Sequence, residues 1–194
     1  MLWCVFDNVS EISARAYMAP ELFSPMSNKQ YIWSFDTDGV LNNYPAVWLE
    51  FIELETWKIF TSVDEAKKML GKQYEVLKHH YRISDFKYQM PINPEARETI
   101  NTLKSRGDIV YISTSRPLTQ YPDMNRRSIE WLKSGGINFD GFLGKKAEVL
   151  KEKHCIFHVD DEEEAIRDLW SKEITYVLYR PSLPPSRTSI KEVL

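Results

Sequence analysis

Short apolar runs alternate with longer segments of mixed polarity along most of the chain. The runs at 31–35, 109–113 and 155–159 are rich in aromatic and β-branched residues, and polar residues follow each run directly. Such runs are typical of buried strands, whereas apolar residues three or four positions apart in the intervening segments indicate amphipathic helices. Strands that alternate with helices predict an α/β fold with a doubly wound parallel sheet.

The segment between the first two of these strands is helical and too long for a simple crossover connection. Pro45 suits the first turn of a helix, Ser62 with Glu65 has the pattern of a capping box, and a further helix is expected over 72–83. We therefore expect a small helical cap, residues 44–91, inserted after the first core strand.

Helix and strand signals continue through the rest of the chain. Asn93 and Pro94 predict the start of a helix, and Gly107 predicts its end. The other expected elements are helices over 9–18, 124–133, 145–151 and 162–170, and strands over 2–6, 139–143 and 174–179. The expected regions are an N-terminal extension (1–30), a core (31–43 and 92–194) and the cap insert (44–91).

Composition is that of an ordinary globular protein. Of the 194 residues, 43% are hydrophobic and 27% are charged, which is sufficient for a buried core. The net charge of −3 provides no basic field for duplex nucleic acid, and no apolar stretch is long enough to cross a membrane. Because there are only two cysteines, Cys4 and Cys155, and no signal-peptide pattern, we expect a reduced protein in the cytoplasm.

Each of the three core strands is followed by a cluster of polar side chains. Because the carboxyl ends of parallel strands meet at one edge of a sheet, these clusters are expected to share one site. Neighbouring carboxylates repel each other unless a cation lies between them, and Mg²⁺ prefers oxygen ligands and keeps waters for a phosphate. The pattern therefore predicts a Mg²⁺ ion with a phosphate beside it. The clusters are Asp36 with Asp38, Thr114 with Ser115 and Arg116, and Asp160 with Asp161, together with Lys145 and Lys146 before the third strand.

Each cluster also has a simpler structural interpretation. Asp and Gly are common turn residues, so the stretch 36–39 also fits a polar turn. In this structural interpretation Thr114 only ends a strand, the lysine pair forms a solvated helix face, and Arg116 makes a surface salt bridge. The acidic run 160–164 favours a helix N-terminus through the helix dipole. One at a time, the clusters do not decide between the two interpretations.

Most of the other candidate residues are interpreted as structural. His79 and His80 are adjacent on a predicted helix and face different directions, which excludes a metal pair. His158 and Cys155 belong to a predicted core strand and are expected to be buried. The aromatic residues of the cap are expected mainly in its core, with one or two as candidates for stacking on a nucleobase. They are Trp48, Phe51, Trp57, Phe60, Tyr74 and Tyr81.

Taken together and in this order, the clusters resemble the four motifs of the haloacid dehalogenase (HAD) superfamily. The resemblance runs from about Tyr31 to Tyr179 and implies a HAD-like Rossmannoid core with a helical cap in the C1 position. Lys145 remains an alternative to Lys146 in motif III. The matching stretches are 36–41 for motif I in its phosphatase form, 112–117 for motif II, Lys146 for motif III and 159–161 for motif IV.

The resemblance implies a Mg²⁺-dependent phosphomonoesterase. Asp36 would be the nucleophile that forms an aspartyl-phosphate, and Asp38 would protonate the leaving oxygen and then activate water. The Asp36 carboxylate, the Asp38 backbone carbonyl and Asp161 would hold Mg²⁺, with Asp160 as a supporting partner of the ligands.

The resemblance also implies which residues bind the substrate. Thr114 would donate to the phosphoryl oxygens, and Lys146 would neutralise charge on the phosphate and the nucleophile. Ser115 and Arg116 would add further contacts, because a guanidinium two residues after the motif II hydroxyl is able to reach a phosphate or a nucleotide.

Within the superfamily, the layout is similar to that of the 5′(3′)-deoxyribonucleotidase group. The shared features are Asp-x-Asp-Gly-Val-Leu, a small helical cap, the stretch 91–94, a Thr-Ser motif II and an Asp-Asp motif IV. This similarity implies nucleoside monophosphates as substrates. The alternatives are a polynucleotide end phosphatase, which the net charge of −3 disfavours, another small-molecule HAD phosphatase, and a non-catalytic HAD-fold binding protein, which the intact Asp36 and Asp38 disfavour.

Overall fold

The computed structural model describes residues 4–6, 30–144, 150–162 and 175–179. The strands in these ranges form one six-stranded sheet in the order β1-β6-β5-β2-β3-β4, and every neighbouring pair is parallel. The predicted parallel sheet is therefore confirmed. The strands are β1 (Cys4–Phe6), β2 (Ile32–Asp36), β3 (Ile109–Ser113), β4 (Gly141–Leu143), β5 (Phe157–Asp160) and β6 (Thr175–Tyr179).

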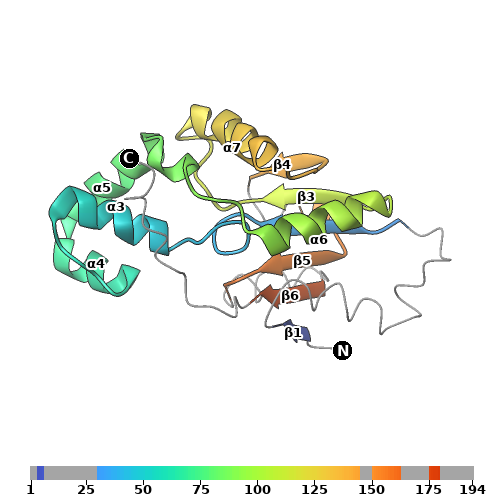
Figure 1. Ribbon diagram of the computed structural model, residues 1–194, viewed down its shortest axis with the longest axis horizontal. Helices are drawn as coiled ribbons and strands as arrows, with labels where there is room; N and C mark the ends of the chain where they lie inside the picture. The colour runs from blue at the N-terminus through green and yellow to red at the C-terminus, as the bar shows by residue number, and fades with distance from the viewer. Residues whose placement is uncertain (1–3, 7–29, 145–149, 163–174, 180–194) are drawn as a thin grey trace.

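The helices fall into two groups. Figure 1 shows α6 across one face of the sheet and α7 near its β4 edge, while α3, α4 and α5 stand beyond the ends toward which the strands point. Among the described helices, none combines the length and apolar character needed to cross a membrane. The predicted helices over 9–18, 145–151 and 162–170 lie wholly or largely outside the described residues. The helical elements are α3 (Ala46–Thr56), α4 (Val63–Leu70), α5 (Lys72–Ile83), the 3₁₀ turn η1 (Phe86–Tyr88), α6 (Pro94–Ser105) and α7 (Pro122–Ser134).

Strand β2 lies at the point in the parallel sheet where the chain order of the strands changes direction. The chain passes from β2 to β3 and β4 on one side, and then to β5 and β6 on the other. In the register, Asp36 lies opposite Ser113 of β3, and Phe35 lies opposite Val159 of β5. The carboxyl ends of three adjacent strands are therefore level at this switch point, where ligands bind in open α/β sheets.

Buried aromatic packing and one buried carboxylate fix the position of β2. The Trp33 ring stacks on Phe157 of β5 with 4.3 Å between ring centroids. The carboxylate of Asp108, at the start of β3, accepts hydrogen bonds from Trp33 Nε1 (3.2 Å) and from the backbone N–H of Tyr31 (3.1 Å). Because both ends of these bonds are buried, they hold β2 in a single register against its neighbours.

The insert, residues 44–91, has an aromatic core of its own. Trp48 is fully buried, and its ring lies 5.1 Å from that of Tyr81 and 5.5 Å from that of Tyr74. The expectation that the cap aromatics form its core is confirmed for these residues, and Phe51 and Phe60 are buried too. It is wrong for Trp57, which is 93% exposed because it follows the last turn of α3 in a left-handed conformation (φ 58°).

Candidate active site

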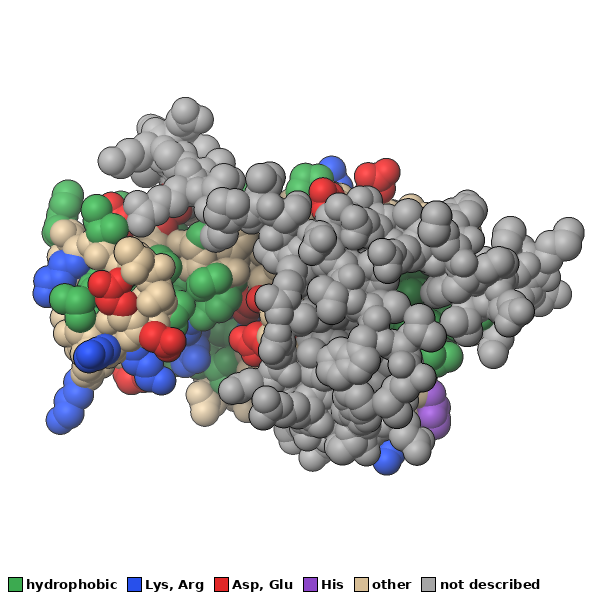
Figure 2. All heavy atoms as spheres, turned by 90° about the horizontal axis from the view of Figure 1, so that it is seen from below, with side chains coloured by type: hydrophobic (Ala, Val, Ile, Leu, Met, Phe, Trp, Pro, Cys, Tyr) green, Lys and Arg blue, Asp and Glu red, His purple; other side chains and the backbone are tan. Residues whose placement is uncertain are grey.

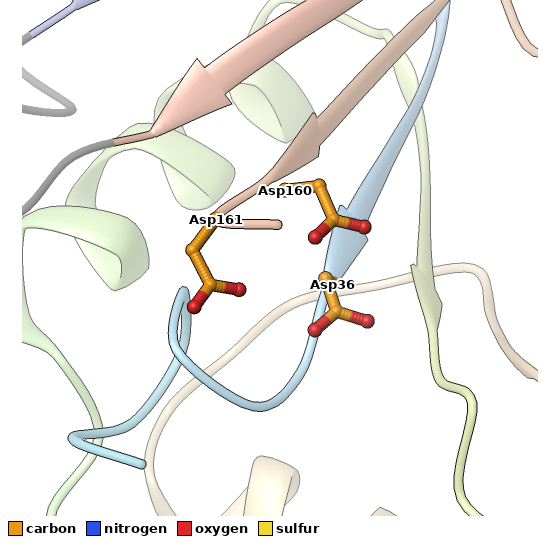
Figure 3. Close-up of side chains that lie close together, drawn as sticks. All are labelled: Asp36, Asp160 and Asp161. Atoms are coloured by element: carbon orange, nitrogen blue, oxygen red, sulfur yellow. The ribbon is translucent and has the colours of Figure 1, made fainter. Parts of the chain in front are cut away.

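Three carboxylates converge at the ends of β2 and β5. Asp36 is the last residue of β2, Asp160 is the last residue of β5, and Asp161 follows it. One oxygen from each carboxylate lies within 4.8 Å of those of the other two. Figure 3 shows the three side chains gathered beside the loop that follows β2. Carboxylates this close destabilise one another in the absence of a positive charge, so an all-oxygen set of this kind is compatible with a hard divalent cation such as Mg²⁺.

The loop after β2 lies directly against Asp161. Gly39 has φ +87°, a conformation that side chains rarely adopt. A Cβ atom added at Gly39 would overlap the Asp161 carboxylate, and even the most distant of the three carboxylate atoms, Oδ1, would lie only 2.5 Å away. Glycine at this position therefore permits the close approach of the β2 loop and the carboxylate.

Asp160 is held by partners on its own side of the cluster. It is 1% exposed, its Oδ2 lies 3.0 Å from Nε2 of the buried His158, and its Oδ1 accepts a hydrogen bond from the backbone N–H of Glu162 (3.0 Å). Both oxygens are thus engaged by protein groups, and the supporting role of Asp160 stays a prediction. His158 is buried as predicted, and its contact with Asp160 follows from the strand, because residues two apart share one face.

Asp38 is the centre of a charged network at the end of the β2 loop. Arg116 donates to both of its oxygens, from Nε (2.9 Å) and Nη2 (2.5 Å), and Asn42 Nδ2 donates to Oδ1 (3.0 Å). The Lys87 ammonium lies 3.7 Å from Oδ2. Burial alone would raise the pKa of Asp38, but Arg116 and Lys87 outweigh it and hold the pKa well below its usual range.

Arg116 makes a salt bridge, but not the surface one that the simpler interpretation predicts. Its side chain is 4% exposed, and besides Asp38 it donates from Nη1 to Ser128 Oγ (3.0 Å). Its backbone N–H donates to Thr114 Oγ1 (3.1 Å), and the Thr114 N–H in turn bonds the Leu143 carbonyl. The exit loop of β3 is therefore ordered by its own side chains.

A cavity of about 180 Å³ joins these groups. Asp36 and Asp38 line it together with Thr114, Ser115 and Arg116, so the structure brings the predicted motif I and motif II residues into one site. Asp161 belongs to the acidic cluster beside them. Lys145 and Lys146 lie outside the described residues. The remaining lining residues are Tyr44, Lys78, Arg82, Lys87, Pro117, Met124 and Glu162.

The insert contributes basic residues that the sequence interpretation missed. Lys78 and Arg82 come from α5 and Lys87 from η1, and all three line the cavity. Burial lowers the pKa of Lys78 to about 8 and, with repulsion from Arg116, the pKa of Lys87 to about 7. The available signal was Lys78 itself, a cation on the apolar face that Tyr74, Leu77 and Tyr81 define on one amphipathic helix.

Comparison with known proteins identifies the fold. A predicted phosphatase from Clostridium acetobutylicum aligns over 84% of this chain and 90% of its own, with 14% identity and a TM-score of 0.57. A hydrolase from Streptococcus pneumoniae TIGR4 aligns over 85% and 98%, with 12% identity and a TM-score of 0.51. The parallel sheet and its flanking helices form the same α/β, Rossmann-like HAD fold as in these structures. No family model and no curated protein sequence matches the chain.

This shared fold confirms the predicted α/β fold class, and the two solved structures are described as a hydrolase and a predicted phosphatase. At identities of 12–14% the likeness concerns the path of the chain. The chemistry of this protein therefore depends on its own side chains.

Proposed function

We propose that the protein is a Mg²⁺-dependent phosphomonoesterase that works through an aspartyl-phosphate at Asp36. The observation that carries the proposal is the meeting of Asp36, Asp160 and Asp161 beside the Asp38–Arg116 pair at the carboxyl edge of the sheet. A nucleophilic carboxylate, a second carboxyl group for proton transfer and a guanidinium for phosphate are the groups that phosphoryl transfer through a covalent enzyme intermediate requires.

In this proposal Asp36 attacks phosphorus, the bond from phosphorus to the leaving oxygen breaks, and Asp38 gives that oxygen a proton. Asp38 then takes a proton from the water that hydrolyses the aspartyl-phosphate. Asp36, Asp161 and the backbone carbonyl of Asp38 would hold Mg²⁺, which supplies charge neutralisation and orientation of the phosphate when bound. Asp160 and its bond to His158 keep the ligands in position.

When substrate binds, Arg116 has two possible acceptors, the Asp38 carboxylate and the phosphate. In the structure it donates to both oxygens of Asp38. A phosphate dianion offers the guanidinium a second bidentate acceptor, and a shift of Arg116 toward it frees Asp38 for proton transfer. Thr114 and Ser115 would donate to the phosphoryl oxygens from the same loop, and Lys146 would add the charge of motif III.

The finer expectations from the sequence stay predictions. Nucleoside monophosphates are the substrates that the resemblance implies, with other small phosphates and polynucleotide ends as alternatives. The presence of Asp36 and Asp38 together in one cavity disfavours a non-catalytic binding protein. The cytoplasmic location is also a prediction.

The test is release of inorganic phosphate from p-nitrophenyl phosphate, nucleoside monophosphates, sugar phosphates and oligonucleotides phosphorylated at their ends. Each substrate is assayed with Mg²⁺ and with EDTA, on the wild type, on Asp36→Asn and on Asp64→Asn. Asp64 is an exposed carboxylate in the first turn of α4 and serves as the matched control. We expect release that needs Mg²⁺, is lost in Asp36→Asn and is unchanged in Asp64→Asn. No release from any substrate by folded protein would refute the proposal.

A further inference from the structure

Four basic side chains line the cavity that holds Asp36 and Asp38. Arg116 comes from the exit loop of β3, whereas Lys78, Arg82 and Lys87 come from the insert. Figure 2 shows basic side chains next to acidic ones on the part of the molecule that α3 to α5 form in Figure 1. The site is therefore built from two walls, an acidic strand edge and a basic face of the insert.

The basic side chains of the cavity differ in whether they form a salt bridge, although the lining also holds the carboxylates of Asp36, Asp38 and Glu162. Arg116 and Lys87 both lie beside Asp38, at 2.5 Å and 3.7 Å. Among the residues that the structure describes, neither Lys78 nor Arg82 makes a salt bridge to a carboxylate within 4.0 Å. Two cations of the insert thus face the cavity without a carboxylate partner in the described part of the chain.

Lys78 is supported by aromatic groups instead of by an anion. Its Nζ donates to the Tyr44 hydroxyl (3.0 Å) and lies 4.4 Å from the centroid of the Trp48 ring. The Arg82 guanidinium lies 5.7 Å from the Tyr121 ring. Such contacts orient the two cations without a salt bridge, so an anionic ligand in the cavity would supply the partner that they lack.

The spacing of Lys78 and Arg82 makes them a pair. They are four residues apart on α5, so they lie on the same face of the helix, one turn from each other. Arg116 and the acidic cluster are already committed to the phosphoryl group that is to be transferred. A neutral leaving group would leave Lys78 and Arg82 without an anionic partner, whereas a leaving group with an anionic substituent would form salt bridges with them.

The cavity also favours a compact ligand over a nucleoside. At about 180 Å³ it is smaller than the 300–1,000 Å³ typical of pockets for larger ligands. The aromatic rings of Trp48, Phe51 and Tyr81 are used in the core of the insert, and among the described residues Tyr44 is the one aromatic side chain in the lining. A nucleobase therefore finds little stacking surface there.

We infer that the substrate of the proposed phosphomonoesterase carries a second anionic group, a carboxylate or a second phosphate, which Lys78 and Arg82 bind. The inference rests on the proposed function and adds the class of substrate to it. The nucleoside monophosphates that the resemblance implies lack such a group beyond the phosphate itself, so they serve as the comparison.

The experiment uses matched pairs that differ in the second charge. Phosphoglycerate is compared with glycerol phosphate, fructose bisphosphate with fructose monophosphate, and a nucleoside monophosphate and p-nitrophenyl phosphate complete the set. kcat/KM is measured for the wild type, Lys78→Met, Arg82→Gln and Lys72→Met. Lys72 is an exposed lysine at the start of the same helix and is the matched control.

We expect kcat/KM to be about 10–100-fold higher for the charged member of at least one pair, because each hydrogen bond to a charged group contributes on that scale. The carboxylate and phosphate pairs show which anion is bound. Lys78→Met and Arg82→Gln should reduce the preference toward one, chiefly through KM, while Lys72→Met should keep it.

Two other outcomes separate the inference from the proposed function. If both members of each pair react equally, or the preference survives in Lys78→Met and Arg82→Gln, the inference is wrong and the phosphomonoesterase proposal stands. If no compound releases phosphate, p-nitrophenyl phosphate included, the proposed function itself fails and the inference falls with it.

Discussion

Replacing Gly39 by alanine tests the proposed metal site, because Gly39 lies in the loop after β2, directly against the proposed ligand Asp161. The substitution introduces one methyl group at a position with φ +87° that lies against Asp161. Gly107→Ala is the matched control, because Gly107 has nearly the same φ (+91°) and its added Cβ would meet nothing within 4 Å. The two variants share the backbone strain, and only Gly39→Ala has the clash.

The magnitudes follow from the local geometry. A residue other than glycine in this conformation costs about 1–2 kcal/mol, which lowers the Tm of a domain of this size by roughly 2–8 °C in both variants. In Gly39→Ala even the farthest atom of the Asp161 carboxylate, Oδ1 at 2.5 Å from the new Cβ, is 0.9 Å inside the 3.4 Å of an ordinary contact, so the carboxylate has to retreat by at least that much. Because Mg²⁺ tolerates little departure from its ligand geometry, a retreat of about 1 Å removes Asp161 as a ligand.

The assay is the Mg²⁺ concentration that gives half-maximal phosphate release, measured at saturating substrate alongside the Tm of each variant. We expect this concentration to rise by about 10–100-fold in Gly39→Ala, with activity recovered at high Mg²⁺, and to stay unchanged in Gly107→Ala. If folded Gly39→Ala needs no more Mg²⁺ than Gly107→Ala, Asp161 does not hold the metal and the ligand set proposed here is wrong.

Three further predictions concern polar groups at the site. His158→Leu should reduce the free energy of unfolding by about 1–3 kcal/mol and weaken Mg²⁺ activation, because Asp160 loses a buried hydrogen-bond donor. His158→Gln should restore part of both the stability and the activation. Equal Mg²⁺ activation in the two variants would contradict this prediction. In urea unfolding, Asp38→Ala should destabilise the protein more than Arg116→Ala does. Asp38→Ala leaves the Arg116 side chain, which is 4% exposed, without its partner, whereas Arg116→Ala leaves the Asp38 side chain, which is 22% exposed. The reverse order of stabilities would contradict this packing. Lys78 binds a proton more weakly folded (pKa about 8) than unfolded (10.5), so wild-type stability relative to Lys78→Met should rise with pH between these values, and a flat difference would count against its burial.

The fold was predictable from local patterns that the structure uses. Asn93 caps α6 through its side chain, which accepts from the backbone N–H of Glu95, and Pro94 stands at the first helical position. Boundaries were less accurate where proline has more than one role. Helix α7 begins at Pro122, two residues before the predicted start at 124, because Pro also suits the first turn there.

The acidic half of the candidate site was also predictable, since its residues directly follow apolar strands. Asp36 and Asp160 end β2 and β5 in register, so the sheet itself brings them together. The basic half was not. Lys87 lies in a 3₁₀ turn of the insert, and the hydrophobic pattern of the sequence does not predict that this turn packs beside Asp38. Its position depends on tertiary packing of the insert against the sheet edge.

The two halves of the site therefore come from separate parts of the chain, the strand edge and the insert. The strand edge positions Asp36, Asp38 and Arg116 through parallel pairing and buried hydrogen bonds, which leaves little freedom for another arrangement. The insert supplies Lys78 and Arg82 from one helix face, where a substitution alters charge in the cavity without touching the strands. It follows that changes at the strand edge should abolish phosphate release from every substrate, while changes on that face of α5 should alter which phosphate is preferred. A variant of α5 that removes release from p-nitrophenyl phosphate as completely as Asp36→Asn would contradict this division.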